Sequence, residues 1–272
     1  MKKIFLLLAF VMTISVANAW SKRVDEAVMI VANEHLTTSA KKLVKKYLGK
    51  NFADDVQYLY AVEKEQAKTM DKRARRRAAE VHYLHLDENF QPKRLKGKDA
   101  YKATQEALAV ISNHKSHSKA EVTLALRTVI NLMCDIHNLS KVRIDGISHS
   151  QKDFKCRVPE GDYGKMAETL SKKPIRWTKT WNRFDGGYGY FTANYWAEDI
   201  RIYLGKDFDK YAKGSLNEWV AESGKMAAHY LETYKPNAVV PYGFYKWREP
   251  VSYEQMIKAT CRLAKLLNET IE

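Results

Sequence analysis

The chain of 272 residues contains 46 lysine and arginine residues against 32 aspartate and glutamate residues, which gives a formal net charge of +14. This excess suits an anionic partner such as nucleic acid or a phosphate ester, and it equally suits plain solubility, so charge by itself selects no function. Beyond the N-terminus, no apolar run approaches the ~20 residues that a membrane-spanning helix needs. The composition therefore excludes a protein that crosses a membrane several times.

The N-terminus has the three parts of a secretory signal peptide. Two lysines at positions 2 and 3 precede an apolar run over residues 4–17, and small residues stand at Ala17 and Ala19. The run is shorter than a membrane span, which favours a removable signal over an anchor. We expect a signal peptide over residues 1–19, cleavage between Ala19 and Trp20, and an exported mature chain without a membrane span, either periplasmic or secreted.

Apolar residues recur at helical spacing through most of the remaining chain. The stretch "SKAEVTLALRTVINLMCDIHNL" predicts a long buried helix, and "SYEQMIKATCRLAKLLNETI" predicts another over residues 252–271. "SAKKLVKKYLG" predicts a shorter helix that follows the cap signal at residues 37–39 and ends at Gly49. The apolar stripe of the long helix comprises Val122, Leu126, Val129, Met133 and Ile136. Because no run alternates apolar and polar residues, we expect an all-α, multi-helix domain over residues 20–272, with an irregular segment at 146–189.

The three cysteines are Cys134, Cys156 and Cys261. In an oxidising compartment one disulfide could form among them, and three pairings are open. Cys134 lies inside the apolar pattern of the long helix, so we expect it to be a buried free thiol. Nothing in the sequence supports a cysteine nucleophile.

Three parts of the chain carry a resemblance to a known family. They are "WSKRVDEAVMIVANEHLTTSAKKLVKKYLG" at the expected mature start, "EVHYLHLD" with "LRTVINLMCDIHNL" in the middle, and "NEWVAESGKMAAHYLETY" with "ATCRLAKLLN" near the end. The chain resembles the zinc-dependent, single-strand-specific nucleases of the mung bean nuclease type, which share the phospholipase C fold. The resemblance covers nearly the whole mature chain and is weakest over residues 146–189. It implies a cluster of three zinc ions that hydrolyses phosphodiester bonds in single-stranded nucleic acid and in 3′-nucleotides.

The resemblance also assigns metal-binding positions. In the family, the free amine and carbonyl oxygen of an N-terminal tryptophan bind zinc, and Trp20 matches that residue once the signal peptide is removed. Asp25 stands where the family has a histidine, and the next carboxylate ligand aligns best with Glu63. His82 and Asp135 match a histidine and an aspartate of the family. A residual metal would be held by these five residues.

At four further positions the family's ligands are replaced. Asn131 and Lys141 stand in place of histidines, and Thr178 and Asn182 stand in place of a histidine and an aspartate. A protonated ammonium cannot bind zinc, and hydroxyl and amide oxygens are poor ligands for it. We therefore expect fewer than three zinc ions per chain, or none.

Loss of zinc would leave the negative charges of the site without a compensating cation. Asp25, Glu63 and Asp135 would then bring three negative charges to one cavity, and unpaired buried carboxylates are strongly destabilising. We hypothesise that Lys141 and the α-amine of Trp20 balance them in an ion-paired pocket. The alternative is a wetter cavity in which Lys141 points to solvent.

Recognition residues also follow from the resemblance. Tyr83 matches an aromatic residue that stacks a nucleobase in the family, and packing of its ring under its own loop is the alternative. The basic runs "DKRARRR" at 71–77 and "SKKPIR" at 171–176 are solvated faces or patches that steer a polyanion. No other histidine is assigned as a metal ligand. The histidines set aside in this way are His85, His114, His117, His137, His149 and His229.

These observations predict an exported, divergent relative of the zinc nucleases. We expect its hydrolytic activity to be weak or lost and its pocket to bind single-stranded nucleic acid, a nucleotide or another anion. Two alternatives stay open: a phosphodiesterase that uses one or two metal ions, and a non-catalytic interaction protein on the same scaffold. The sequence assigns no catalytic residue and no oligomeric state.

Overall fold

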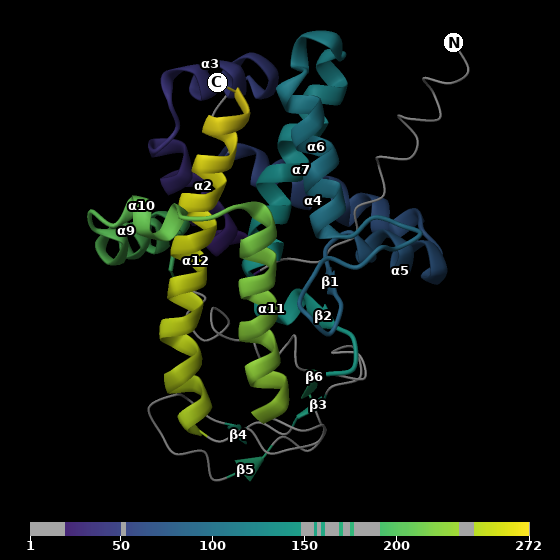
Figure 1. The fold of residues 1–272 in the computed structure, drawn as a ribbon, viewed down its shortest axis with the longest axis vertical. Coiled ribbons are helices and arrows are strands. Elements are labelled where there is room, and N and C mark those ends of the chain that lie inside the picture. The colour runs from purple at the N-terminus through teal and green to yellow at the C-terminus, as the bar shows by residue number, and fades with distance from the viewer. Residues whose placement is uncertain are drawn as a thin grey trace.

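The computed structural model describes residues 20–49, 53–147, 191–233 and 242–271, and the backbone of four two-residue strands between 155 and 176. Side chains at 57–60, 63, 232–233 and 242–249 lie outside this description. Helices dominate the described residues, as Figure 1 shows, and the all-α fold class predicted from the sequence is confirmed. None of these helices combines the length and the apolar composition that a membrane span requires.

The elements follow one another along the chain with short connections. In order they are α2 (Lys22–Glu34), α3 (Thr38–Leu48), α4 (Ala53–Thr69), α5 (Lys72–Glu80), β1 (Leu84–Leu86), α6 (Ala100–Ser112), η1 (His114–Ser116), α7 (Lys119–His137), η2 (Leu139–Lys141), β2 (Val142–Ile144), β3 (Lys155–Cys156), β4 (Pro159–Glu160), β5 (Thr169–Leu170), β6 (Ile175–Arg176), α9 (Ala193–Leu204), α10 (Phe208–Ala212), α11 (Leu216–Thr233) and α12 (Tyr242–Ile271).

Local sequence signals set the ends of several helices. Ser118 begins α7 with a complete capping box, in which its hydroxyl accepts from the Glu121 backbone N–H and the Glu121 carboxylate accepts from the Ser118 backbone N–H. Thr37 caps α3 in the same position, and Gly49 ends that helix with a positive φ of 83°. Glycine suits this left-handed backbone because it has no Cβ.

The helix α7 lies at the centre of the core. It packs along α6 and also contacts α12, α3 and α2. The five residues of its predicted stripe, Val122 to Ile136, are all buried, so the sequence prediction for this helix is confirmed. On another side of the core, α2 packs against α4 and α9. Its contact with α9 joins the N-terminal half of the chain to the C-terminal half.

The C-terminal helix is longer than predicted. Its expected start at residue 252 is wrong, because α12 begins at Tyr242 and runs through Pro250. A proline inside a helix removes one backbone hydrogen bond and normally marks a helix boundary. The extended helix lies beside α11, and both run toward the end of the molecule that carries the short strands β3 to β6 (Figure 1).

A small parallel sheet stands apart from the helical pattern. Residues 84–86 of β1 pair with residues 142–144 of β2, with Leu84 opposite Val142 and Leu86 opposite Ile144. Strands of three residues are too short to show apolar alternation in a sequence. This pair joins the end of α5 to the end of α7 and therefore positions the candidate site.

Candidate functional site

A tight turn after α7 brings Lys141 back toward the end of that helix. The helix ends at His137, and η2 follows after Asn138. The Asn138 carbonyl accepts from the Lys141 backbone N–H at 2.8 Å, and the Asn138 side-chain oxygen accepts from the Ser140 backbone N–H at 3.0 Å. Side-chain capping of this kind competes with continuation of the helix. The chain therefore reverses within four residues and directs Lys141 toward the last turn of α7.

The parallel sheet brings a second segment to the same place. Because Leu84 pairs with Val142, the residues that precede these strands also lie close together. Tyr83 precedes Leu84, and Lys141 precedes Val142. The Lys141 ammonium lies 5.3 Å from the centre of the Tyr83 ring. The register of three residue pairs thus unites segments that are 58 positions apart.

A buried cluster forms around Asp135. The Nδ1 atom of His82 lies 2.5 Å from Asp135 Oδ2, within hydrogen-bond distance. The Lys141 Nζ lies 3.7 Å from Asp135 Oδ1. His82 and Asp135 have no exposed surface, and only 4% of Lys141 is exposed. The alternative in which Lys141 points to solvent is therefore wrong. Each oxygen of the carboxylate faces a nitrogen of a basic side chain.

A second buried carboxylate lies at the start of α2. The backbone nitrogen of Trp20 donates to Asp25 Oδ1 at 3.4 Å, and both residues are buried. Asp25 stands in the first turn of the helix, where the backbone N–H groups favour negative charge. The sequence reasoning placed these two residues together, and the structure brings them into contact.

The thiol of Cys134 connects the two carboxylates. Burial raises the pKa of Cys134 well above its ordinary value, and the negative charges of Asp25 and Asp135 raise it further, as does a hydrogen bond with Asp25. The thiol is free and has no exposed surface, as predicted. The sequence did not predict that the thiol lies close to Asp25, although Cys134 directly precedes Asp135. Asp25 and Asp135 therefore belong to one polar site.

The Tyr83 ring is covered by a cation on one face. The Arg143 guanidinium carbon lies 3.6 Å from the ring centre, and its Nη1 lies 2.5 Å from Glu80 Oε2. His85 also contacts Glu80, with Nε2 3.2 Å from Oε2. The His85 hydrogen bond lowers the pKa of Glu80 against the effect of burial, and Arg143 lowers it further. The sequence reasoning missed Arg143, whose only signal is its place two residues after Lys141.

The described donors do not fit a zinc cluster. No group of three or more histidine, cysteine, aspartate or glutamate side chains is arranged to hold a metal ion within the described part of the chain. At the positions matched to the family, His82 contacts one oxygen of Asp135, and the Lys141 ammonium lies beside the other. Asn131 lies one turn before Asp135 on α7 and is half-buried. The chemistry that this arrangement provides is charge pairing.

Three of the predicted site residues fall outside the described residues. The Glu63 side chain is one, although its helix α4 is described, and Thr178 and Asn182 are the others. The segment predicted to be irregular falls outside as well, apart from residues 146–147 and the backbone of its short strands. Of the histidines that were set aside, His137 lies in the core, where its Nδ1 contacts the Met133 carbonyl at 2.9 Å.

No protein-family model matches the chain, and no curated protein matches it.

Proposed function

We propose that this chain binds single-stranded nucleic acid or nucleotides through the Tyr83 and Lys141 region, without the three-zinc hydrolysis of the family that it resembles. The observation that carries the proposal is the buried contact between the Lys141 ammonium and Asp135 at 3.7 Å. A lysine supplies positive charge, but it cannot polarise a phosphate and lower the pKa of a bound water as a zinc ion does. The site thus lacks the means to activate water, because the charge of Lys141 is used to balance Asp135.

The charges in the site can balance one another without a metal. Asp25 and Asp135 are both buried and would be strongly destabilising if unpaired. Lys141 compensates one of them. Cleavage after Ala19 would convert the Trp20 backbone N–H, which already points to Asp25, into an ammonium that compensates the other. The site would then be held together by ion pairs instead of metal–ligand bonds.

A recognition surface adjoins this cluster. Tyr83 is half-buried and lies next to the cluster, and the Arg143 guanidinium covers one face of its ring. Arginine binds phosphate through two parallel N–H groups. A tyrosine ring can stack on any of the nucleobases, so it does not depend on sequence. Together they supply a base-stacking group beside a phosphate-binding group, which is the combination that a sequence-independent single-strand site needs.

Binding of a fluorescent single-stranded oligonucleotide tests the proposal. Tyr83→Ala should weaken binding by about 1–3 kcal/mol, the usual contribution of one stacked base. Tyr203→Ala is the matched control, because Tyr203 is a tyrosine on α9 that is 60% exposed. It should leave affinity unchanged. Equal affinity of the wild type and the Tyr83 variant would contradict the proposal.

A second function is favoured by the contact between His82 and Asp135. These residues supply an imidazole and a carboxylate, two of the donors that one catalytic zinc ion uses. A single metal would have to displace their mutual contact, and a weak one-metal phosphodiesterase is therefore the second candidate. Hydrolysis of single-stranded DNA that needs added zinc and is lost in His82→Ala would favour this second function over the first.

A further inference from the structure

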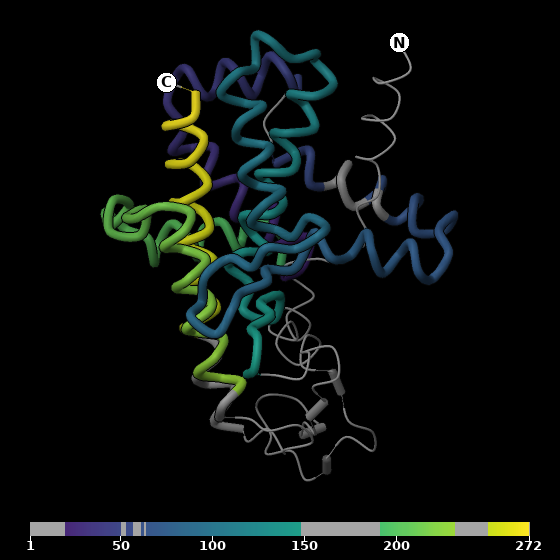
Figure 2. Tube along the Cα trace, turned by 45° about the vertical axis from the view of Figure 1, so that its right-hand side comes forward, coloured from purple at the N-terminus to yellow at the C-terminus, as the bar shows by residue number. Residues whose placement is uncertain are grey.

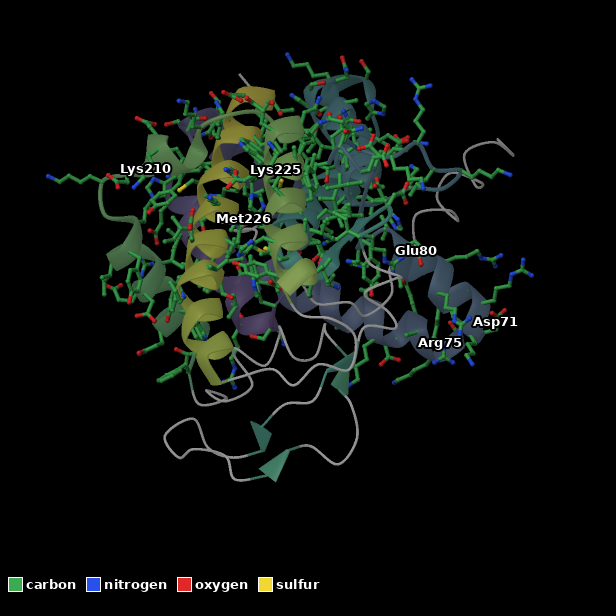
Figure 3. All side chains as sticks on the ribbon, turned by 60° about the horizontal axis from the view of Figure 1, so that its bottom comes forward. Asp71, Arg75, Glu80, Lys210, Lys225 and Met226 are labelled. Carbon is green, nitrogen blue, oxygen red and sulfur yellow. The ribbon has the colours of Figure 1, made fainter. Side chains whose placement is uncertain are left out.

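The helix α5 presents an unusually basic surface away from the core. In Figures 1 and 2 it projects to the side of the helical body, beyond the end of α4. Its five basic residues are all exposed, whereas Ala78 is buried. The five are Lys72, Arg73, Arg75, Arg76 and Arg77. Figure 3 shows side chains of this arm extending into solvent, with Glu80 at its inner end.

Few acidic groups offset this charge. Within the described residues, no carboxylate forms an ion pair with any of the five basic side chains of α5. Glu80 instead contacts Arg143 and His85 at the inner end of the helix. Asp71 caps α5 by accepting from the Ala74 N–H at 2.7 Å, and this bond lowers the pKa of its carboxyl. Most of the positive charge is therefore left to an external partner.

The angular spread of these charges discriminates between partners. Successive residues of a helix are rotated by about 100°, so the five cations cover an arc of about 200° and Arg75 and Arg77 point about 160° apart. A flat anionic surface can contact only one side of such a helix. An interfacial membrane helix also needs large apolar side chains on its opposite face, and α5 offers only alanines there, Ala74 and Ala78. A groove with phosphates on both walls can contact cationic side chains over the whole arc.

We infer that α5 docks in the groove of double-helical DNA and binds its phosphate backbone on both sides. The helix has nine residues, which makes it about 13.5 Å long, and the major groove of B-DNA is about 12 Å wide and admits an α-helix. Arginine predominates among the cations, and it binds phosphate through two parallel hydrogen bonds. Contacts of this kind carry no sequence information, so α5 binds duplexes of any sequence. None of these five cations belongs to the single-strand site at Tyr83, which lies beyond the inner end of α5.

The test compares two variants with the same change of charge. Arg73→Gln/Arg76→Gln/Arg77→Gln removes three cations from α5 and keeps residues with good helix propensity. Its matched control removes three exposed lysines elsewhere, Lys206→Gln/Lys213→Gln/Lys225→Gln. Fluorescence anisotropy of a labelled duplex of about 20 base pairs, titrated over a series of salt concentrations, measures affinity and its salt dependence.

The α5 variant should bind the duplex at least about tenfold more weakly, and its slope of log K against log[salt] should be shallower by about 2–3. The control should retain most of the wild-type affinity and slope. Equal losses in both variants would overturn the inference in favour of net charge alone. Intact duplex binding, with loss of binding to phosphatidylglycerol vesicles, would assign α5 to a membrane surface. Neither result affects the Tyr83 test, because that variant carries an unaltered α5.

Discussion

The Lys141 ammonium lies 3.7 Å from Asp135 Oδ1 in a site where both side chains are almost fully buried. Only five residues separate the two in sequence, and they reach each other because the chain reverses through Asn138 directly after α7. The pair stands where the resemblance would place a histidine ligand and an aspartate ligand of zinc. A charge pair of this kind can be tested by removal of either partner.

Lys141→Met should lower the free energy of unfolding by about 3–5 kcal/mol, because the change leaves a buried carboxylate without its cation. The matched control is Lys93→Met, which breaks the exposed ion pair between Lys93 and Asp145. Exposed pairs contribute about 0–1 kcal/mol. Urea denaturation of both variants measures the difference, and a neutral Lys141→Met would show that the pair compensates no charge.

Zinc content is expected to stay below three ions per chain. Lys141 occupies the surroundings of Asp135, and a protonated lysine is no ligand. Elemental analysis after dialysis into zinc-containing buffer measures the stoichiometry. His82→Ala should remove any zinc that remains, whereas His117→Ala, a change at a partly exposed histidine outside the site, should not. Three tightly held ions would contradict both the alignment of ligands and the proposed function.

Processing at Trp20 should stabilise the protein. A chain that begins at Trp20 carries an α-ammonium against Asp25, whereas one additional alanine before Trp20 keeps the neutral amide. Hydrogen bonds to charged groups contribute about 1.5–3 kcal/mol, so the shorter chain should be more stable by about this amount at pH 7. The difference should vanish in an Asp25→Asn background. If it persists there, another group binds the new amine.

Stability should also depend on pH through His137. Burial lowers the pKa of His137 well below its ordinary value of 6.5, and the positive charge of Arg262 lowers it further. The Nε2 atom faces Arg262 Nη1 at 3.0 Å, so the ring is neutral in the folded protein. The unfolded chain takes up a proton below pH ~6.5 and the folded chain does not. Stability is therefore complete above pH ~6.5 and falls below it by about 1.4 kcal/mol per pH unit for this group.

His137→Gln removes that contribution and should make the fall in stability between pH 6.5 and 5 shallower. His117→Gln, at a partly exposed position, is the control and should change the slope little. Denaturation curves at half-unit pH steps measure the slopes. Parallel slopes for the wild type and His137→Gln would show that another group takes up the proton.

Much of the helical framework follows from the sequence alone. The stripe of α7, the left-handed stop at Gly49 and the burial of Cys134 all come from local periodicity and backbone chemistry, which operate over a few residues. The contact between Trp20 and Asp25 came instead from the family resemblance, and it spans only five positions, from just before α2 to its first turn. The prediction for the start of α12 was wrong, because the helix continues through Pro250, a residue that normally marks a helix boundary.

The site itself depends on contacts between distant segments. His82 reaches Asp135, and Tyr83 reaches Arg143, because β1 pairs with β2 in one register. Three-residue strands carry no periodic signal, so their pairing is decided by the packing of the helices that precede them. The sequence thus determined which charged residues the chain contains, and only the tertiary structure decided that Lys141 faces Asp135. A buried charge is stable only beside its partner, and the long-range pairing of the chain fixes where that partner lies.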